Sequence, residues 1–230
     1  PAEREWSIRP WGVGLLSVSS LSLSQVSLLV LILTTVSFDG FVETGLWKRA
    51  LVDWHSVFSV FGSSSFTIMT TLGLIVAPML CFGLFGITSV LMVRLVDIET
   101  SAIGLMRTFA ISFIPIALAY HIAHFFSFLM VQGQRIFALI SDPFGWGWNL
   151  FGTAGTEIDI GIVNARFIWI LSVGVIVMGH IAAIYVAHVC AVRAFRGKGQ
   201  AVRSQYPMLV LMVGYTMASL WIVAQPITTA

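Results

Sequence analysis

The stretch that decides the fold is residues 167–194, which reads FIWILSVGVIVMGHIAAIYVAHVCAVRA. Its only charged residue is Arg193, and it is longer than the roughly 20 apolar residues that a membrane-spanning helix requires. In lipid such a segment folds as a helix, because a helix satisfies its own backbone hydrogen bonds without water. The stretch therefore predicts a transmembrane helix.

Further segments have the same character, so the sequence predicts an all-α integral membrane bundle of about five transmembrane helices. The predicted spans are residues 16–38, 66–93, 108–131, 167–194 and 208–226, which together form a single transmembrane domain over residues 1–230. Pro78 and Pro115 lie inside two spans and should kink them, because proline removes a backbone donor.

Between the first two spans, residues 46–58 carry apolar side chains at helical spacing with charged residues between them. This pattern predicts a short amphipathic helix that lies on the membrane surface. The other long loop, 132–166, is rich in glycine and tryptophan, and we expect compact turns there rather than a strand.

Composition indicates the same class of protein. Of the 230 residues, 58% are hydrophobic and 10% are charged, whereas an ordinary soluble domain has about 25% charged residues. The net charge is +2, and no cluster of Lys and Arg with interleaved aromatics indicates a nucleic-acid partner. Cys81 and Cys190 lie in apolar stretches and predict neither a disulfide framework nor a metal knuckle. The first predicted partner is therefore the lipid bilayer.

The basic residues predict an orientation. With five spans, the N-terminus and the loops at 94–107 and 193–206 share one side of the membrane. Because basic loops stay in the cytoplasm, we expect a cytoplasmic N-terminus and a C-terminus outside. The basic residues on the predicted cytoplasmic side are Arg4, Arg9, Arg94, Arg107, Arg193, Arg196, Lys198 and Arg203, and those on the other side are Lys48, Arg49, Arg135 and Arg166.

Four histidines lie within the predicted spans, where an ionisable group is costly and usually faces the bundle interior. His121 and His124 are three residues apart on one helix, so both rings can point to one side. At about 1.5 Å of rise per residue, His121 and His180 lie roughly 17 and 20 Å below the outer ends of two successive spans. We therefore predict that His121, His124 and His180 meet near mid-membrane as metal ligands.

Alternatives for this histidine set stay open. Three imidazoles with a carboxylate or water suit a transition metal ion such as Zn, Fe or Cu. Two axial imidazoles suit a haem, which is the less favoured cofactor. Hydrogen bonding between helices, with a tyrosine or a backbone carbonyl as partner, requires no cofactor. We expect His188 to stand apart beside Arg193 and to hydrogen-bond, and His55 to lie outside the cluster.

Asp39 and Asp142 are the candidate catalytic acids on the outer side. Asp39 ends the first span, and Gly40 after it is expected to permit a sharp exit of the chain. A carboxylate there suits a metal site, a general base or a cap of the next helix. Asp142 precedes Pro143, and an Asx-type turn or helix cap is the favoured alternative for it.

Several short motifs follow one another along the chain. They are SFDG at 37–40, AHFFS at 123–127, QGQ at 132–134, SDPFGWGWNLFGT at 141–153, GH at 179–180, AH at 187–188 and QYP at 205–207. Together they resemble bacterial multi-pass membrane proteins known as fenitrothion hydrolases, a membrane-bound type of organophosphate hydrolase. The resemblance covers about residues 30–225, and it departs from the family at Asn149 and Val189, where members tend to carry acidic residues.

The resemblance implies a hydrolase of phosphotriester-like substrates in a bacterial inner membrane, with other membrane subunits as partners. Members have more helices before this region, so it also implies that the chain is a C-terminal portion. Alongside a metal-dependent hydrolase in which Asp39 or Asp142 positions a metal-bound water, two other functions stay open. One is a redox or metal-handling subunit that binds haem or copper, and the other is a non-catalytic structural subunit of a larger membrane complex.

Overall fold

The computed structural model describes residues 12–96, 100–195 and 197–225, and every regular element in these ranges is helical. The long helices are α1 (Leu23–Val42), α3 (Ser65–Val96), α5 (Phe113–Gln132), α7 (Ala165–Ala194) and α8 (Lys198–Val223). The short helices are α2 (Gly45–Phe58), α4 (Ala102–Phe109) and α6 (Arg135–Ser141), and the 3-10 helices are η1 (Val13–Ser17), η2 (Ser59–Ser64), η3 (Ala110–Ser112) and η4 (Ile160–Ile162). The predicted all-α helical bundle is confirmed.

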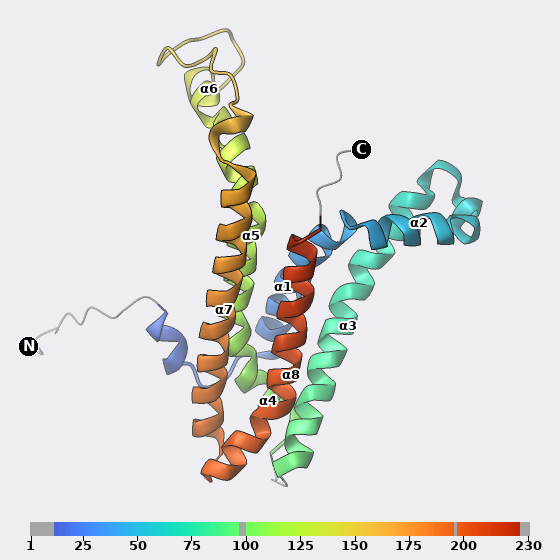
Figure 1. Cartoon of the computed structure of the whole chain (residues 1–230), viewed down its shortest axis with the longest axis vertical. Helices are drawn as coiled ribbons and strands as arrows, with labels where there is room; N and C mark the ends of the chain where they lie inside the picture. The colour runs from blue at the N-terminus through green and yellow to red at the C-terminus, as the bar shows by residue number, and fades with distance from the viewer. Residues whose placement is uncertain (1–11, 97–99, 196, 226–230) are drawn as a thin grey trace, which may run out of the picture.

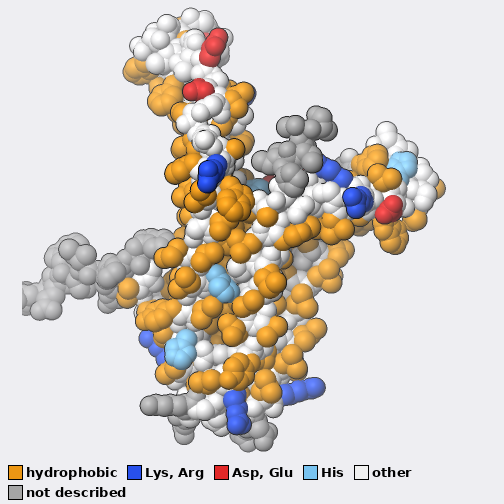
Figure 2. Space-filling model, viewed as in Figure 1, with side chains coloured by type: hydrophobic (Ala, Val, Ile, Leu, Met, Phe, Trp, Pro, Cys, Tyr) orange, Lys and Arg blue, Asp and Glu red, His pale blue; other side chains and the backbone are white. Residues whose placement is uncertain are grey.

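Five helical stretches in the described residues are long and apolar enough to cross a membrane. Their outer surfaces are apolar too: Met178 on α7 and Val210 on α8, for example, leave 65% and 72% of their surface uncovered by protein. Hydrophobic side chains cover the shaft of the bundle in Figure 2. Because water would make such a surface unfavourable, the chain is a multi-pass membrane protein whose helices face lipid.

The helices form a bundle with one tall pair (Figure 1). Helices α5 and α7 pack against each other over the longest interface, which confirms that these two spans are direct neighbours. Both extend beyond the other helices, and α6 and the loop after it lie at their far end. Helix α8 packs against α7 and α3, and α1 packs against α3 and α5. Helix α2, the predicted amphipathic helix, lies crosswise at the upper ends of α1 and α3.

Two helices begin at other residues than the sequence predicted. Helix α1 begins at Leu23, because Ser22 caps it: the Ser22 hydroxyl accepts from the Gln25 backbone, and the Gln25 side chain accepts from the Ser22 backbone. Helix α8 begins at Lys198 rather than at 208, because Pro207 is accommodated inside the helix instead of marking its start. Pro226, the predicted end of the last span, lies outside the described residues.

A short 3-10 helix precedes Pro115 in the third predicted span, while Pro78 lies inside the continuous helix α3, and the predicted kinks at both prolines stay predictions. Proline at 115 cannot donate to the carbonyl of Ile111, four residues before it, and its ring crowds that carbonyl. The chain is a 3-10 helix at Ala110–Ser112, between α4 and α5. The third predicted span is therefore two α-helices joined by a tighter turn.

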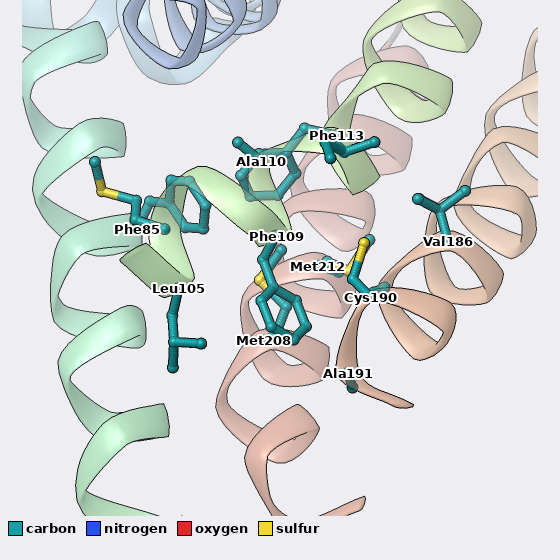
Figure 3. Close-up of a cluster of buried hydrophobic side chains, with 14 of the residues drawn as sticks. Phe85, Leu105, Phe109, Ala110, Phe113, Val186, Cys190, Ala191, Met208 and Met212 are labelled. Carbon is teal, nitrogen blue, oxygen red and sulfur yellow. The ribbon is translucent and has the colours of Figure 1, made fainter. Parts of the chain in front are cut away.

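The main buried core lies at the lower half of the bundle, where α4 and the start of α5 meet α3, α7 and α8 (Figure 3). Phe109 and Ala110 at its centre are completely buried. The rings of Phe85 on α3 and Phe113 on α5 meet edge to face with centroids 4.7 Å apart, an arrangement that aromatic pairs prefer. Upward from this core, α3 separates from the tall pair in Figure 1.

Charged side chains divide between the two ends of the bundle. In the view of Figure 2, acidic side chains lie on the upper half, while Lys and Arg also gather at the lower end. Arg94, Arg193 and Arg203 lie near the lower ends of α3, α7 and α8, and Arg107 is in the last turn of the short helix α4 at the same end of the bundle. Arg4, Arg9 and Arg196 lie outside the described residues. This division agrees with the sequence pattern, and the orientation in a membrane stays a prediction.

Candidate functional site

A histidine and an aspartate from different helices pair at the upper end of the bundle. The Nε2 of His124 on α5 lies 2.7 Å from Oδ2 of Asp39 in the last turn of α1. This distance is typical of a short, charge-assisted hydrogen bond. The pair joins two helices that are not neighbours in the sequence, so it depends on the packing of α1 against α5.

The carboxylate of this pair faces outward and the imidazole lies behind it. The Asp39 side chain is 64% exposed, whereas that of His124 is 25% exposed. Asp39 borders a hollow of about 380 Å³ between α1, α3 and α5, and no other lining residue is ionisable. The rest of the lining is mainly apolar, and it consists of Thr35, Val36, Phe38, Val42, Thr70, Leu74 and Phe125. An apolar molecule in this hollow would meet one oriented carboxylate.

A buried phenol lies below the pair. Tyr120 is one turn before His124 on α5, and the two rings stack at 15° with centroids 6.3 Å apart. The Tyr120 hydroxyl is buried and has no hydrogen-bond partner in the described part of the chain. An unpartnered buried hydroxyl is unfavourable, so this phenol lowers the stability of the packed helices.

Gly40 lies inside α1 at a point of close helix packing, which corrects the prediction that it marks a sharp exit of the chain. Helix α1 continues through Gly40 to Val42. A Cβ at Gly40 would lie 2.9 Å from Ile222 Cγ2, 3.3 Å from the Tyr120 hydroxyl oxygen and 3.8 Å from His124 Nδ1. The glycine therefore permits the close approach of α1 to α5 and α8 at the point where the phenol and the imidazole are nearest to α1.

The other predicted ligands have separate partners. The Nδ1 of His121 lies 2.9 Å from the Ala117 carbonyl oxygen within its own helix. The Nδ1 of His180 on α7 lies 2.8 Å from the Thr216 hydroxyl of α8. Among the described ranges, no three or more His, Cys, Asp or Glu side chains form a group that would hold a metal ion. A metal ion on His121, His124 and His180 stays a prediction.

The remaining histidines lie where the sequence led us to expect them. His188 pairs with a side chain of the neighbouring helix, its Nδ1 lying 3.1 Å from Oε1 of Gln205, which confirms a hydrogen-bonding environment. His55 belongs to α2, where its ring lies 5.1 Å from that of Phe66. Both are therefore separate from the Asp39–His124 pair.

Asp142 supports a turn, in agreement with the alternative favoured for it. It is the C-cap of α6, and its two carboxylate oxygens accept hydrogen bonds from the backbone nitrogens of Trp146 and Gly147 at 2.9 and 2.8 Å. Gly145 and Gly147 have φ of +70° and +79°, so these turns favour glycine. Since both oxygens are used, the geometry assigns Asp142 a structural task, and its catalytic role stays a prediction.

The loop after α6 presents a cluster of aromatic rings at the tip of the tall pair. The rings of Phe144, Trp146 and Trp148 lie with centroids 5.0 to 5.8 Å apart. Asn149 fixes the loop, because its Oδ1 accepts from the Ser141 hydroxyl and from the Ala154 backbone. The amide at 149 therefore has a local structural task, and we call residues 144, 146 and 148 the aromatic tip.

Comparison with known proteins found no matching family model, no matching curated protein and no matching solved structure.

Sequence reasoning singled out Asp39 and His124 separately but did not pair them. It also gave Tyr120 only as one possible hydrogen-bond partner for the histidines, although its position four residues before His124 puts both on one helix face. Thr216, the partner of His180, has no signal in the sequence.

Proposed function

We propose that this protein is a membrane hydrolase that cleaves neutral, apolar esters of the phosphotriester type at the Asp39–His124 pair. The observation that supports this proposal is the 2.7 Å contact between His124 Nε2 and Asp39 Oδ2 beside an apolar hollow. Paired carboxylate and imidazole groups accept and pass protons in many hydrolytic sites.

Asp39 is assigned as the proton acceptor, because its carboxylate is the member of the pair that meets the hollow. His124 is a positioning residue that fixes one carboxylate oxygen and leaves the other free for water. In the reaction, a water oxygen forms a bond to phosphorus while the bond from phosphorus to the leaving oxygen breaks. The water proton passes to Asp39 and then to the leaving group, which departs as an alcohol or phenol.

The walls of the hollow favour an uncharged substrate. Side chains of Val36, Leu74 and Phe125 line it, and no described cation lies among its lining residues. A phosphate diester or monoester anion would require such a cation, whereas a neutral triester gains from apolar contacts. A neutral ester also dissolves in lipid, so it reaches a hollow between membrane helices directly from the bilayer.

The protein is placed in a bacterial inner membrane with the Asp39 end outward, in accord with the positive charge at the opposite end. It works with other membrane subunits. The aromatic tip supports this second part, because Phe144 and Trp146 are 64% and 68% exposed at the far end of the tall pair. Large aromatic side chains are enriched where proteins bind one another.

The test uses purified protein in lipid nanodiscs and a neutral dialkyl nitrophenyl phosphate, whose released nitrophenol is followed by absorbance. Asp39→Asn retains the shape and removes the base, so we expect at least a hundredfold loss of turnover, the lower range for general-base catalysis. His124→Gln retains a donor toward Asp39 and should lose less. Asp53→Asn, an exposed acid on α2, is the matched control and should retain wild-type turnover.

Turnover that is equal in wild type and Asp39→Asn would reject the assignment, and so would the absence of hydrolysis above the uncatalysed rate in every preparation. The same assay after treatment with a chelator separates the metal-dependent version from the metal-free one. Loss of activity that zinc, iron or copper restores would support the predicted metal, and unchanged activity would support the Asp39–His124 pair acting alone.

A further inference from the structure

We infer that the lower end of the bundle, opposite the Asp39–His124 pair, binds one anionic phospholipid. The site joins a long apolar groove on the lipid-facing side of α5 and α7 to two arginines. Nothing in the proposed hydrolase reaction requires it, because it lies on other residues and at the other end of α5.

The groove has the size and the lining of an acyl-chain site. It has a volume of about 650 Å³, within the range of roughly 300–1,000 Å³ that ligand sites occupy. The 3-10 helix η1 forms one wall, Pro115 and Leu118 of α5 form the floor, and Ala182 and Val186 of α7 form the other wall. The lining also includes Tyr185, which is largely exposed, and the other lining side chains are apolar, so a hydrocarbon chain fits against them.

Two neighbouring hollows lead from the groove to the arginines. A hollow of about 240 Å³ shares Leu15, Leu16 and Val18 with the groove and is also lined by Arg193. A second hollow, of about 320 Å³, shares Thr108 and Ala194 with the first hollow and is also lined by Arg107. The groove and the two hollows are thus adjacent, because each shares lining residues with the next.

Each arginine is held in place and still has donors to offer. The Nε of Arg107 donates to the Leu21 carbonyl at 2.7 Å, and Nη1 of Arg193 donates to the Leu16 carbonyl. A guanidinium has five N–H donors, so most of them remain available. Within the described ranges, neither arginine pairs with a carboxylate. Two fixed cations that have no carboxylate partner among the described residues form a site for an anion.

The depth of the groove favours a phospholipid over a free anion, because only a phospholipid has acyl chains to fill it. Arg193 is in the last turn of α7, whereas Val186 and Ala182 lie about two and three turns further into the bundle from it, roughly 10 and 16 Å at 1.5 Å per residue. A phosphate at the arginines therefore places an attached acyl chain in the groove, pointing toward mid-membrane. Basic pockets between membrane helices bind lipid head groups by this arrangement.

The test adds lipids to delipidated full-length chain in mild detergent and follows its thermal unfolding and its mass by native mass spectrometry. The probes are phosphatidylglycerol, phosphatidylcholine with the same chains, and inorganic phosphate. We expect one phosphatidylglycerol to bind and to raise the unfolding temperature more than phosphatidylcholine does, and inorganic phosphate to have no effect. Equal effects of both lipids, or stabilisation by inorganic phosphate alone, would overturn the inference.

Variants locate the site. Arg193→Gln should weaken binding of phosphatidylglycerol about fivefold, since one arginine near a lipid surface contributes about that factor. Arg203→Gln on α8 is the control, because it removes an exposed charge at the same end but lines none of the three hollows. If Arg193→Gln impairs folding, Ala182→Trp provides a second test. Ala182 is exposed, so the introduced indole should fill the groove and abolish binding of phosphatidylglycerol. Unchanged binding in Ala182→Trp, or an equal loss in Arg203→Gln, would refute the site.

Discussion

Adding one methyl group at Gly179 should destabilise the bundle, because α7 meets α5 there without room for it. A Cβ at this position would lie 2.3 Å from the Ala119 Cβ and 3.1 Å from the Pro115 carbonyl oxygen. Carbon atoms pack at about 3.5–4.0 Å, so the two helices would have to separate by roughly 1.2–1.7 Å. Overpacking of this kind costs about 1–3 kcal/mol. At about 2–4 °C per kcal/mol for a chain of this length, Gly179→Ala should lower the Tm by about 2–12 °C.

The chain contains its own probe for this measurement. Cys190 lies on α7 and is 8% exposed, so a thiol-reactive dye reports its exposure as the protein unfolds in detergent. Gly174→Ala is the matched control, because this glycine lies on the same helix with no atom within 4 Å of an added Cβ. The Tm of Gly174→Ala should be unchanged or higher, and Ala119→Gly should restore part of the loss in Gly179→Ala. Equal Tm values for Gly179→Ala and Gly174→Ala would refute the close contact.

Three further predictions test the polar contacts and the predicted metal. Thr216→Val removes the partner of His180 and should lower the free energy of unfolding by about 0.6–1.7 kcal/mol, the range for hydrogen bonds between membrane helices. If Thr216→Val lowers it by the same amount in a His180→Ala background, the pairing is contradicted. Asp142→Ala leaves the backbone donors of Trp146 and Gly147 without their acceptor, so limited proteolysis should cut the loop after α6 faster than in wild type, and unchanged cleavage would show that the cap is dispensable. If the histidines bind a metal, elemental analysis should find it in wild-type protein and a reduced amount in His124→Ala; no metal in either would end the metal hypothesis.

The class of the fold and the pairing of its tall helices could be predicted from the sequence, because both depend on local properties. Length and hydropathy decide which segments prefer lipid, and the loop between α5 and α7 makes these helices antiparallel neighbours. Helix starts were less accurate. The capping box at Ser22 and Gln25 is visible in the sequence, but it lies inside the predicted span, whose start was set at residue 16 by hydropathy. Proline occurs both inside helices and at their boundaries, so Pro207 does not show by itself where α8 begins.

The partners of the polar residues could not be predicted, because they depend on how each helix is rotated about its axis. Hydropathy is nearly uniform around a helix that faces lipid on one side and other apolar helices on the rest, so it carries little information on rotation. Asp39 and His124 are 85 residues apart in the chain, and their contact requires α1 to pack on α5 at one particular rotation. The choice of Thr216 as the partner of His180 follows from the rotation of α8 in the same way.

The four intramembrane histidines contact partners of different chemistry, and this difference singles out His124. His121 contacts a backbone carbonyl, His180 a hydroxyl and His188 an amide, and each of these partners satisfies a ring nitrogen without adding charge. Only His124 contacts a carboxylate. If that contact served helix packing alone, an amide at position 39 would make the same hydrogen bond without the cost of placing a charged group at the edge of the membrane. Asp39→Asn therefore separates the two explanations: unchanged unfolding with lost turnover means that the acid is there for chemistry, whereas lost stability with retained turnover means that it is there for packing.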